Sequence, residues 1–194
     1  LGDDALGVDV RAALADGTIR RILVIGQGTA AVAGGAVSRA LEAELAGMAP
    51  SRSIDVEDCP ATELSGFGLA SDMSDTLVVA ISQSGTTTDT NRTVDLVRAR
   101  GALVVAIVNR RNSDLVDRAD GVLYTSDGRD VEMSVASTKA FYAQAVAGNL
   151  LAVAVADAAG APGSPDRPEL LAGLRDLPEA MVEVLALRDH VAAI

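Results

Sequence analysis

The chain has 194 residues, which is enough for one domain and a short additional segment. A chain of this length buries roughly two thirds of its unfolded surface on folding. Hydrophobic residues make up 49% of it and aromatic residues only 2%, so the core must be built from aliphatic side chains. The net charge of -11 argues against a nucleic-acid-binding surface, which needs clustered cations, and the single cysteine excludes an internal disulfide.

Apolar runs that are rich in β-branched residues alternate along the chain with segments of helical length. The runs predict short buried strands, and the alternation predicts right-handed βαβ crossovers and an α/β fold with a parallel sheet covered by helices on both faces. Ligands bind such sheets at the carboxyl ends of the strands, so the loops that follow the strands carry the functional information. The predicted strands are residues 22–25, 53–56, 76–81, 103–108 and 122–124, and the predicted helices are residues 29–47, 87–100, 113–119 and 138–158.

The sequence changes character after the last of these helices. Residues 159–168 are rich in glycine and proline and predict a linker, and residues 169–194 predict one or two helices separated near Pro178. The apolar run at 150–156 is well short of the ~20 residues that cross a bilayer, and no signal peptide precedes the first strand. We therefore expect a cytoplasmic protein with no membrane partner and, because the chain starts at Leu1, a piece of a longer one.

The segment directly after the third predicted strand has the strongest chemical signature. It reads Ser82-Gln83-Ser84-Gly85-Thr86-Thr87 and leads straight into a predicted helix. Hydroxyls and an amide stand beside the unpaired N–H groups and the positive dipole end of a helix N-terminus, where an anion is stabilised without a cationic side chain. Gly85 allows the backbone to turn sharply and to approach a ligand closely. The segment predicts a phosphate-binding loop, and the alternative is an ordinary polar loop with a capping Ser or Thr.

A second loop, Gly26-Gln27-Gly28-Thr29-Ala30-Ala31, follows the first predicted strand and fits the loose G-x-G-x-x-A form of a dinucleotide fingerprint. That fingerprint also requires an acidic residue about 20 positions further on to hold a ribose, and Asp55 and Glu57 come late for that role. A dinucleotide-binding domain is therefore an alternative that the hydroxyl-rich loop disfavours. A Walker A loop is excluded, because the sequence contains no G-x-x-x-x-G-K-[ST] and its only lysine is Lys139.

The third notable segment, Glu132–Phe141, lies between the fifth predicted strand and the long helix. Ser137 is a natural N-cap there, and Lys139 then falls in the first turn, where the helix dipole disfavours a cation. Such a position suggests a partner for the lysine, either Glu132 or an anionic ligand. A solvated lysine with a flexible stem is the alternative.

Three stretches together resemble the ligand-binding signatures of SIS (sugar isomerase) domains: the Gly28-Thr29 turn, the loop Ile81–Thr87 and the segment Val135–Phe141. They span about residues 20–158 in the family's order, and the last is similar in particular to the first SIS domain of the glucosamine-6-phosphate synthases, which are glutamine-fructose-6-phosphate aminotransferases. The resemblance implies a flavodoxin-like three-layer αβα sandwich with a five-stranded parallel sheet that holds a hexose or hexosamine 6-phosphate. By position it implies phosphate contacts from Ser82, Gln83, Ser84, Gly85 and Thr87 with Gly28 and Thr29 alongside, and sugar contacts from Val135 and Ser137.

Two loops depart from the pattern of the synthases. Where the synthases commonly read Cys-Gly-Thr-Ser this chain has Gln27-Gly28-Thr29-Ala30, and their Ser-Gly-Glu-Thr is here Ser84-Gly85-Thr86-Thr87. The missing serine hydroxyl at Ala30 removes one potential donor, which is worth about 0.5–1.5 kcal/mol if it is neutral. These changes bear on specificity for fructose 6-phosphate.

Isomerisation of a sugar phosphate needs a base and an acid, which in the synthases come largely from a second SIS domain and a neighbouring subunit. No second set of SIS signatures follows residue 158. Glu132 is the one carboxylate near the signature segments that we consider as a base, and we assign no catalytic residue. His190 is expected to be a surface residue and Cys59 an inert thiol. We expect residues 1–160 to form an SIS domain that binds a sugar phosphate without converting it alone, and residues 161–194 to lead toward a second SIS domain.

The long helix at 138–158 is apolar around much of its circumference and needs more cover than one sheet face provides. This predicts a homodimer or a neighbouring domain; no cofactor or metal site is predicted. Three functional classes stay open: the substrate-binding half of an aminotransferase-isomerase, a regulatory sugar-phosphate sensor attached to a DNA-binding module, and a dinucleotide-binding enzyme.

Overall fold

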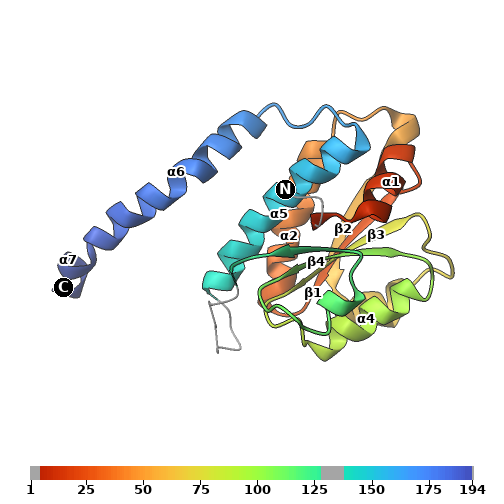
Figure 1. Ribbon diagram of the computed structural model, residues 1–194, viewed down its shortest axis with the longest axis horizontal. Coiled ribbons are helices and arrows are strands. Elements are labelled where there is room, and N and C mark those ends of the chain that lie inside the picture. The colour runs from red at the N-terminus through yellow and green to blue at the C-terminus, as the bar shows by residue number, and fades with distance from the viewer. Residues whose placement is uncertain (1–4, 128–137, 194) are drawn as a thin grey trace. The chain divides into compact units, whose positions relative to one another are not determined.

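The computed structural model describes residues 5–127 and 138–193 (Figure 1). The chain divides after Gly163 into two compact units. The larger unit is an α/β domain that contains all the strands of the described chain, and the smaller unit, which starts at Ser164, is helical.

The α/β unit is built on a five-stranded parallel sheet with the order β2-β1-β3-β4-β5. This is the flavodoxin-like, doubly wound order. Every residue of β3 is buried, whereas β2 at the sheet edge is largely exposed, which explains why the central strands are continuous apolar runs and β2 is not. The strands are β1 (Arg21–Gly26), β2 (Asp55–Pro60), β3 (Thr76–Ser82), β4 (Leu103–Val108) and β5 (Gly121–Tyr124).

Helices cover both faces of the sheet, so the predicted three-layer αβα sandwich is confirmed. In Figure 1, α1 (Val8–Asp16), α2 (Thr29–Leu45) and α5 (Lys139–Ala159) lie on one side of the sheet, and α4 (Thr88–Arg98) lies on the other. Alternate residues of each central strand point to opposite faces, and each face forms its own apolar cluster. The shorter elements are η2 (Pro50–Arg52), α3 (Ala61–Glu63), η3 (Leu64–Gly68) and η4 (Val116–Arg118).

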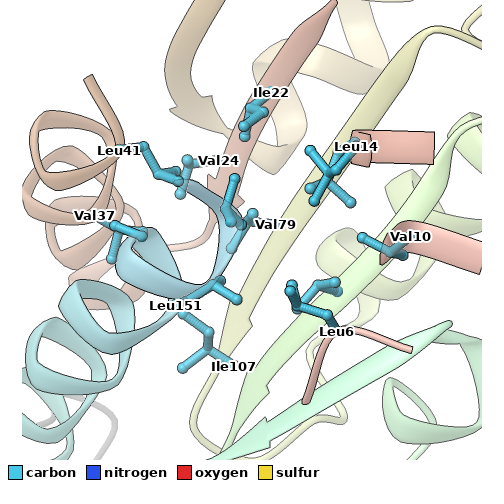
Figure 2. Close-up of a cluster of buried hydrophobic side chains, with 14 of the residues drawn as sticks. Leu6, Val10, Leu14, Ile22, Val24, Val37, Leu41, Val79, Ile107 and Leu151 are labelled. Carbon is cyan, nitrogen blue, oxygen red and sulfur yellow. The ribbon is translucent and has the colours of Figure 1, made fainter. Parts of the chain in front are cut away.

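The larger apolar cluster lies between the sheet and α1, α2 and α5. Figure 2 shows Val37 and Leu41 of α2 and Leu151 of α5 gathered over Val24 and Val79 of the sheet. All five side chains are at most 1% exposed and none is aromatic, as the composition predicts. Aliphatic packing of this kind depends on close fit, because every methyl group contributes to a dense interior.

Helix α5 is long and apolar enough, by length and composition alone, to cross a membrane. Its residues Ala147, Leu151 and Val155 are buried in the core cluster, and its length packs against α2 and α1. We therefore assign α5 as a core helix of the α/β unit, whose apolar circumference is covered in part by these two helices.

Two predictions from the sequence are corrected here, and one helix was not predicted. Residues 113–119 do not form a helix beyond the short η4, because the amide of Leu115 donates to the carbonyl of Gly85 outside the segment. The strand predicted at 53–56 lies at 55–60, where it aligns with β1 in parallel register. Helix α1 has only Val10 and Leu14 buried along its length, and this weak pattern was missed.

The helical unit contains α6 (Arg167–Ala186) and α7 (Arg188–Ala192). Helix α6 runs through Pro178, so the break predicted there is wrong and lies at Leu187 instead. A proline removes one N–H donor from a helix, and the carbonyl left without a partner is tolerated where water can reach it. No residue of α6 is buried, which is consistent with that explanation.

Candidate functional site

The strand order reverses direction between β1 and β3, and the space beyond the carboxyl ends of these two strands is called the crevice below. The chain leaves β1 for α2 on one face of the sheet and leaves β3 for α4 on the other, so the two loops diverge at the carboxyl ends of neighbouring strands. This is the topological switch point at which doubly wound sheets bind their ligands. The fold therefore brings Gly28 and Thr29 next to the segment Ser82–Thr87 (the hydroxyl loop), although about 50 residues of sequence separate them.

The hydroxyls of the hydroxyl loop bond to one another and to the loop backbone. Ser82 Oγ accepts the amide of Gly85 at 3.0 Å and lies 3.2 Å from Thr87 Oγ1. Ser84 Oγ accepts both the amide of Thr86, at 3.2 Å, and its hydroxyl, at 3.0 Å. Each hydroxyl has one proton to donate, so the proton of Ser84 and one proton of the Ser82–Thr87 pair stay available to an acceptor.

The start of α4 adds main-chain donors to these hydroxyls. Thr87 is the N-cap of α4 but makes no side-chain capping hydrogen bond, so the amides of the first turn have no cap. Within the described residues, the amides of Ser84 and Thr87 donate no hydrogen bond either. An anion placed here would satisfy these amides and would lie at the positive end of the helix dipole.

Gly85 is required at its position for two reasons. Its φ of +65° lies in the left-handed region, and a Cβ there would come 2.0 Å from Ser113 Oγ. Its carbonyl accepts the amide of Leu115 at 3.0 Å and the side-chain amide of Asn91 at 3.2 Å. The conformation of the hydroxyl loop is therefore fixed from both sides, by the segment after β4 and by α4. Sequence reasoning missed Ser113 and Asn91, because only the folded chain brings them to the loop.

The loop after β1 presents Gly28 and Thr29 to the other side of the crevice. Gly28 is the N-cap of α2 with φ +60°, and Thr29 is the first residue of that helix. The side chain of Gln27 reaches toward α3, where its Nε2 lies 3.5 Å from Thr62 Oγ1, while its buried Oε1 has no partner in the described chain. Gln27 therefore ties this loop to the neighbouring one after β2.

The segment that precedes α5 is only partly described. Val135, Ser137 and Glu132 lie outside the described residues, so the structure does not place them. Helix α5 starts at Lys139 with Thr138 as its N-cap, and the prediction of Ser137 as N-cap is wrong. Lys139 is exposed at the first position of the helix.

Other candidate reactive groups lie away from the crevice or are inactive. Half-burial of Cys59 raises the pKa of its thiol, and the nearby carboxylates of Asp58 and Glu57 raise it further, so the thiolate is disfavoured. His190 is exposed on α7. Within residues 5–127 and 138–193, no group of His, Cys, Asp and Glu side chains could hold a metal ion.

A groove of about 460 Å³ lies at the end of α2 and the start of β2, away from the carboxyl ends of the strands. Its lining includes three carboxylates, from Glu42, Asp55 and Glu57. A phosphate would be repelled by these charges, so the crevice between β1 and β3 is the better candidate for an anionic ligand.

Comparisons with known proteins show the family to which the chain belongs. A family model described as "SIS domain" matches residues 18–154. The glutamine–fructose-6-phosphate aminotransferase (isomerizing) of Symbiobacterium thermophilum is 39% identical over 175 residues, which cover 89% of this chain and 27% of that protein. The protein of the same name from Corynebacterium glutamicum is 43% identical over 116 residues, which cover 60% of this chain and 18% of that protein.

A solved structure also matches the fold. The C-terminal domain of glucosamine-fructose-6-phosphate aminotransferase from Francisella tularensis superposes with a TM-score of 0.76 and 25% sequence identity, and the match covers 98% of this chain and 51% of that one. The chain thus spans 18–27% of the length of the two aminotransferases above and about half of this structural relative.

Proposed function

Because the chain belongs to the SIS domain family, we propose that it is the sugar-phosphate-binding domain of an aminotransferase or phosphosugar isomerase, with a hexose or hexosamine 6-phosphate as ligand. The observation that carries this proposal is the hydroxyl loop, where available hydroxyl protons and uncapped amides converge on the start of α4. A phosphate monoester is close to dianionic at neutral pH and offers three acceptor oxygens, which matches a site of donors only.

In this proposal the ligand takes over hydrogen bonds that the free loop makes internally. Ser82 and Thr87 turn from each other toward a phosphate oxygen, and Ser84 donates the proton that its two bonds from Thr86 leave unused. Gln83 and the turn at Gly28 and Thr29 complete the site. Gly85 allows the backbone to approach the ligand. Val135 and Ser137 supply the sugar contacts.

Calorimetric titration of the chain with fructose 6-phosphate, glucosamine 6-phosphate and unphosphorylated fructose tests the proposal. The phosphorylated sugars are expected to bind and fructose is not. Ser84→Ala and Thr87→Val should each weaken binding roughly tenfold or more, as expected for a lost hydrogen bond to a charged group. Ser53→Ala is the matched control, because its hydroxyl bonds only the carbonyl of Pro50 at the far end of the sheet. Stabilisation by NAD in place of hexose phosphates would contradict the proposal.

We also propose that the chain does not interconvert ketose and aldose on its own. The crevice, as far as the structure describes it, presents hydroxyls and amides, and the one histidine of the chain lies on α7. Incubation with fructose 6-phosphate followed by an assay for glucose 6-phosphate gives a direct readout. Formation of the aldose above a no-protein blank would overturn this part of the proposal.

The parent protein is proposed to be cytoplasmic and homodimeric, with residues 161–194 leading to a second SIS domain. Support comes from the exposed apolar side chains of α6, including Met181 and Val184, and from the structural relative, of which this chain covers 51%. Light scattering on the chain measures its mass in solution. A strictly monomeric result would contradict the homodimer, and a parent gene without a second set of SIS signatures would contradict the domain order.

A further inference from the structure

Two arginines, Arg110 and Arg111, follow β4 at the same edge of the sheet as the hydroxyl loop, which follows the neighbouring strand β3. Both are exposed, and neither forms an ion pair with a carboxylate of the described chain. They are two adjacent cations without a carboxylate partner among the described residues, in a chain whose net charge is -11. The described arginines that pair with carboxylates lie elsewhere: Arg21, Arg98 and Arg118.

The backbone of this arginine pair is fastened to the hydroxyl loop. The amides of Asn109 and Arg110 both donate to the carbonyl of Gln83, at 3.2 and 3.3 Å. Ser113 Oγ donates to the carbonyl of Arg110 at 3.1 Å and packs against Gly85. The two loops therefore hold each other in place, and the backbone that carries the two arginines is fixed beside the hydroxyl loop.

The guanidinium of Arg111 is already ordered. Its Cζ lies 4.2 Å from the centre of the Tyr124 ring, and its Nε lies 3.5 Å from the carbonyl oxygen of Asp127. Stacking on an aromatic face uses the plane of the guanidinium and leaves its terminal N–H groups free to donate at the edge. Within the described chain these terminal nitrogens, and the whole guanidinium of Arg110, donate no hydrogen bond. Binding an anion at Arg111 would thus cost little additional ordering of its side chain.

Among the residues that the structure describes, no carboxylate forms an ion pair with either arginine. Asp114 is exposed on the same segment, yet it forms no ion pair with either arginine, and the carbonyl of Asp127 rather than its carboxylate is the group near Arg111. A planar guanidinium donates two parallel hydrogen bonds to a phosphoryl or carboxylate group, which makes these two groups its natural partners.

We propose that Arg110 and Arg111 form a second anion-binding subsite beside the hydroxyl loop, and that the preferred ligand is a hexose 6-phosphate with a second acidic group, phosphoryl or carboxylate, on the same molecule. The proposal rests on the proposed function, because it takes the 6-phosphate to be held by the hydroxyl loop. It narrows the substrate class from sugar monophosphates to sugar phosphates with two acidic groups.

The test is calorimetric titration at one fixed ionic strength with fructose 6-phosphate, fructose 1,6-bisphosphate and 6-phosphogluconate. The wild-type chain should bind at least one of the two doubly acidic ligands about tenfold or more tighter than fructose 6-phosphate. The double variant Arg110→Gln/Arg111→Gln should lose this preference and keep its affinity for fructose 6-phosphate. Arg39→Gln/Arg100→Gln makes the same charge change on α2 and just before β4, away from the site, and should keep the preference.

The comparison of the two doubly acidic ligands shows whether the second group is phosphoryl or carboxylate. Equal affinity of the wild-type chain for all three ligands would overturn the inference, and so would an equal loss for all three in the arginine variant. Suppose that fructose 6-phosphate binds and Ser84→Ala weakens this binding, but the arginine variant does not lose affinity selectively for the doubly acidic ligands. In that case only the inference about the arginines fails. If none of the three ligands binds, the proposed function fails as well. Circular dichroism of each variant confirms that it is folded.

Discussion

Gly148 of α5 sits where α5 crosses α2, and replacing it with alanine sets two effects of known size against each other. Alanine stabilises a helix interior by about 0.8–1 kcal/mol relative to glycine. A Cβ at this position, however, would come 2.1 Å from Val37 Cγ2, 3.0 Å from its Cβ and 3.1 Å from its Cγ1. Because the Cβ of Val37 is fixed to the α2 backbone, rotation of the side chain cannot clear the overlap, and the two helices must separate.

Overpacking of this kind costs roughly 1–3 kcal/mol, and the severity of the overlap places Gly148→Ala near the upper end. After the gain in helix propensity is subtracted, we expect a net loss of about 1–2 kcal/mol in the free energy of unfolding. For a chain of this length, 1 kcal/mol corresponds to roughly 2–4 °C in the melting temperature. Urea unfolding followed by circular dichroism at 222 nm, together with a thermal scan, measures both quantities.

Two further variants separate the causes. Gly35→Ala, on α2, is the matched control, because its Cβ would meet no atom closer than 3.5 Å, so the propensity gain should appear alone. Val37→Ala should cost about 2 kcal/mol by itself, yet combined with Gly148→Ala it should be less destabilising than the sum of the two single changes by at least about 1 kcal/mol. A Gly148→Ala chain as stable as Gly35→Ala would refute the reasoning, because it would mean that α2 and α5 do not approach as closely as described.

Three other changes follow from local contacts. Asp120→Asn should lower the free energy of unfolding by about 1–2 kcal/mol in a urea titration, because Asp120 Oδ2 accepts the amide of Val104 at 2.7 Å in a charge-assisted hydrogen bond. Gly85→Ala should abolish measurable binding of fructose 6-phosphate in calorimetry, because the φ of +65° and the overlap with Ser113 Oγ force the hydroxyl loop to move. Cys59 should react with iodoacetamide more slowly than a free cysteine at pH 8, because its raised pKa keeps the reactive thiolate scarce until alkaline pH. The rate of this reaction should increase as the pH rises.

Each of these has its own control. Asp114→Asn, at an exposed carboxylate whose side chain makes no ion pair in the described chain, should change stability far less than Asp120→Asn. Gly160→Ala, at the C-cap of α5, changes a glycine whose φ of +68° is also positive but whose Cβ would meet no atom within 4 Å, so it should keep binding of fructose 6-phosphate and shows the effect of a positive φ without a steric overlap. Cysteine modification at the free-thiol rate in the folded chain would show that Cys59 is not half-buried beside two carboxylates.

Sequence patterns were enough to identify the fold class and the hydroxyl loop. Continuous apolar runs arise because β1, β3 and β4 are buried on both faces of a parallel sheet, and no neighbour from another part of the chain is needed to recognise them. The Ser82–Thr87 segment was recognisable for a similar reason, since its donors are contiguous and the following helix is amphipathic. These features depend on local composition and periodicity, which a linear sequence contains in full.

The tertiary structure decided what depends on contacts between distant segments. The failure of residues 113–119 to form a helix follows from Leu115 and Ser113 bonding and packing against Gly85, nearly 30 residues earlier in the chain. The strand order, which puts β1 beside β3 and so creates the crevice, follows from which strands pair, and pairing leaves no local mark in the sequence. The position of Arg110 and Arg111 beside the hydroxyl loop also leaves no local mark, because the sequence shows them only as two polar residues in a loop. Hydrogen bonds to Gln83 across neighbouring strands place them beside the hydroxyl loop, because a folded chain satisfies its buried donors with whichever acceptors the packing brings near.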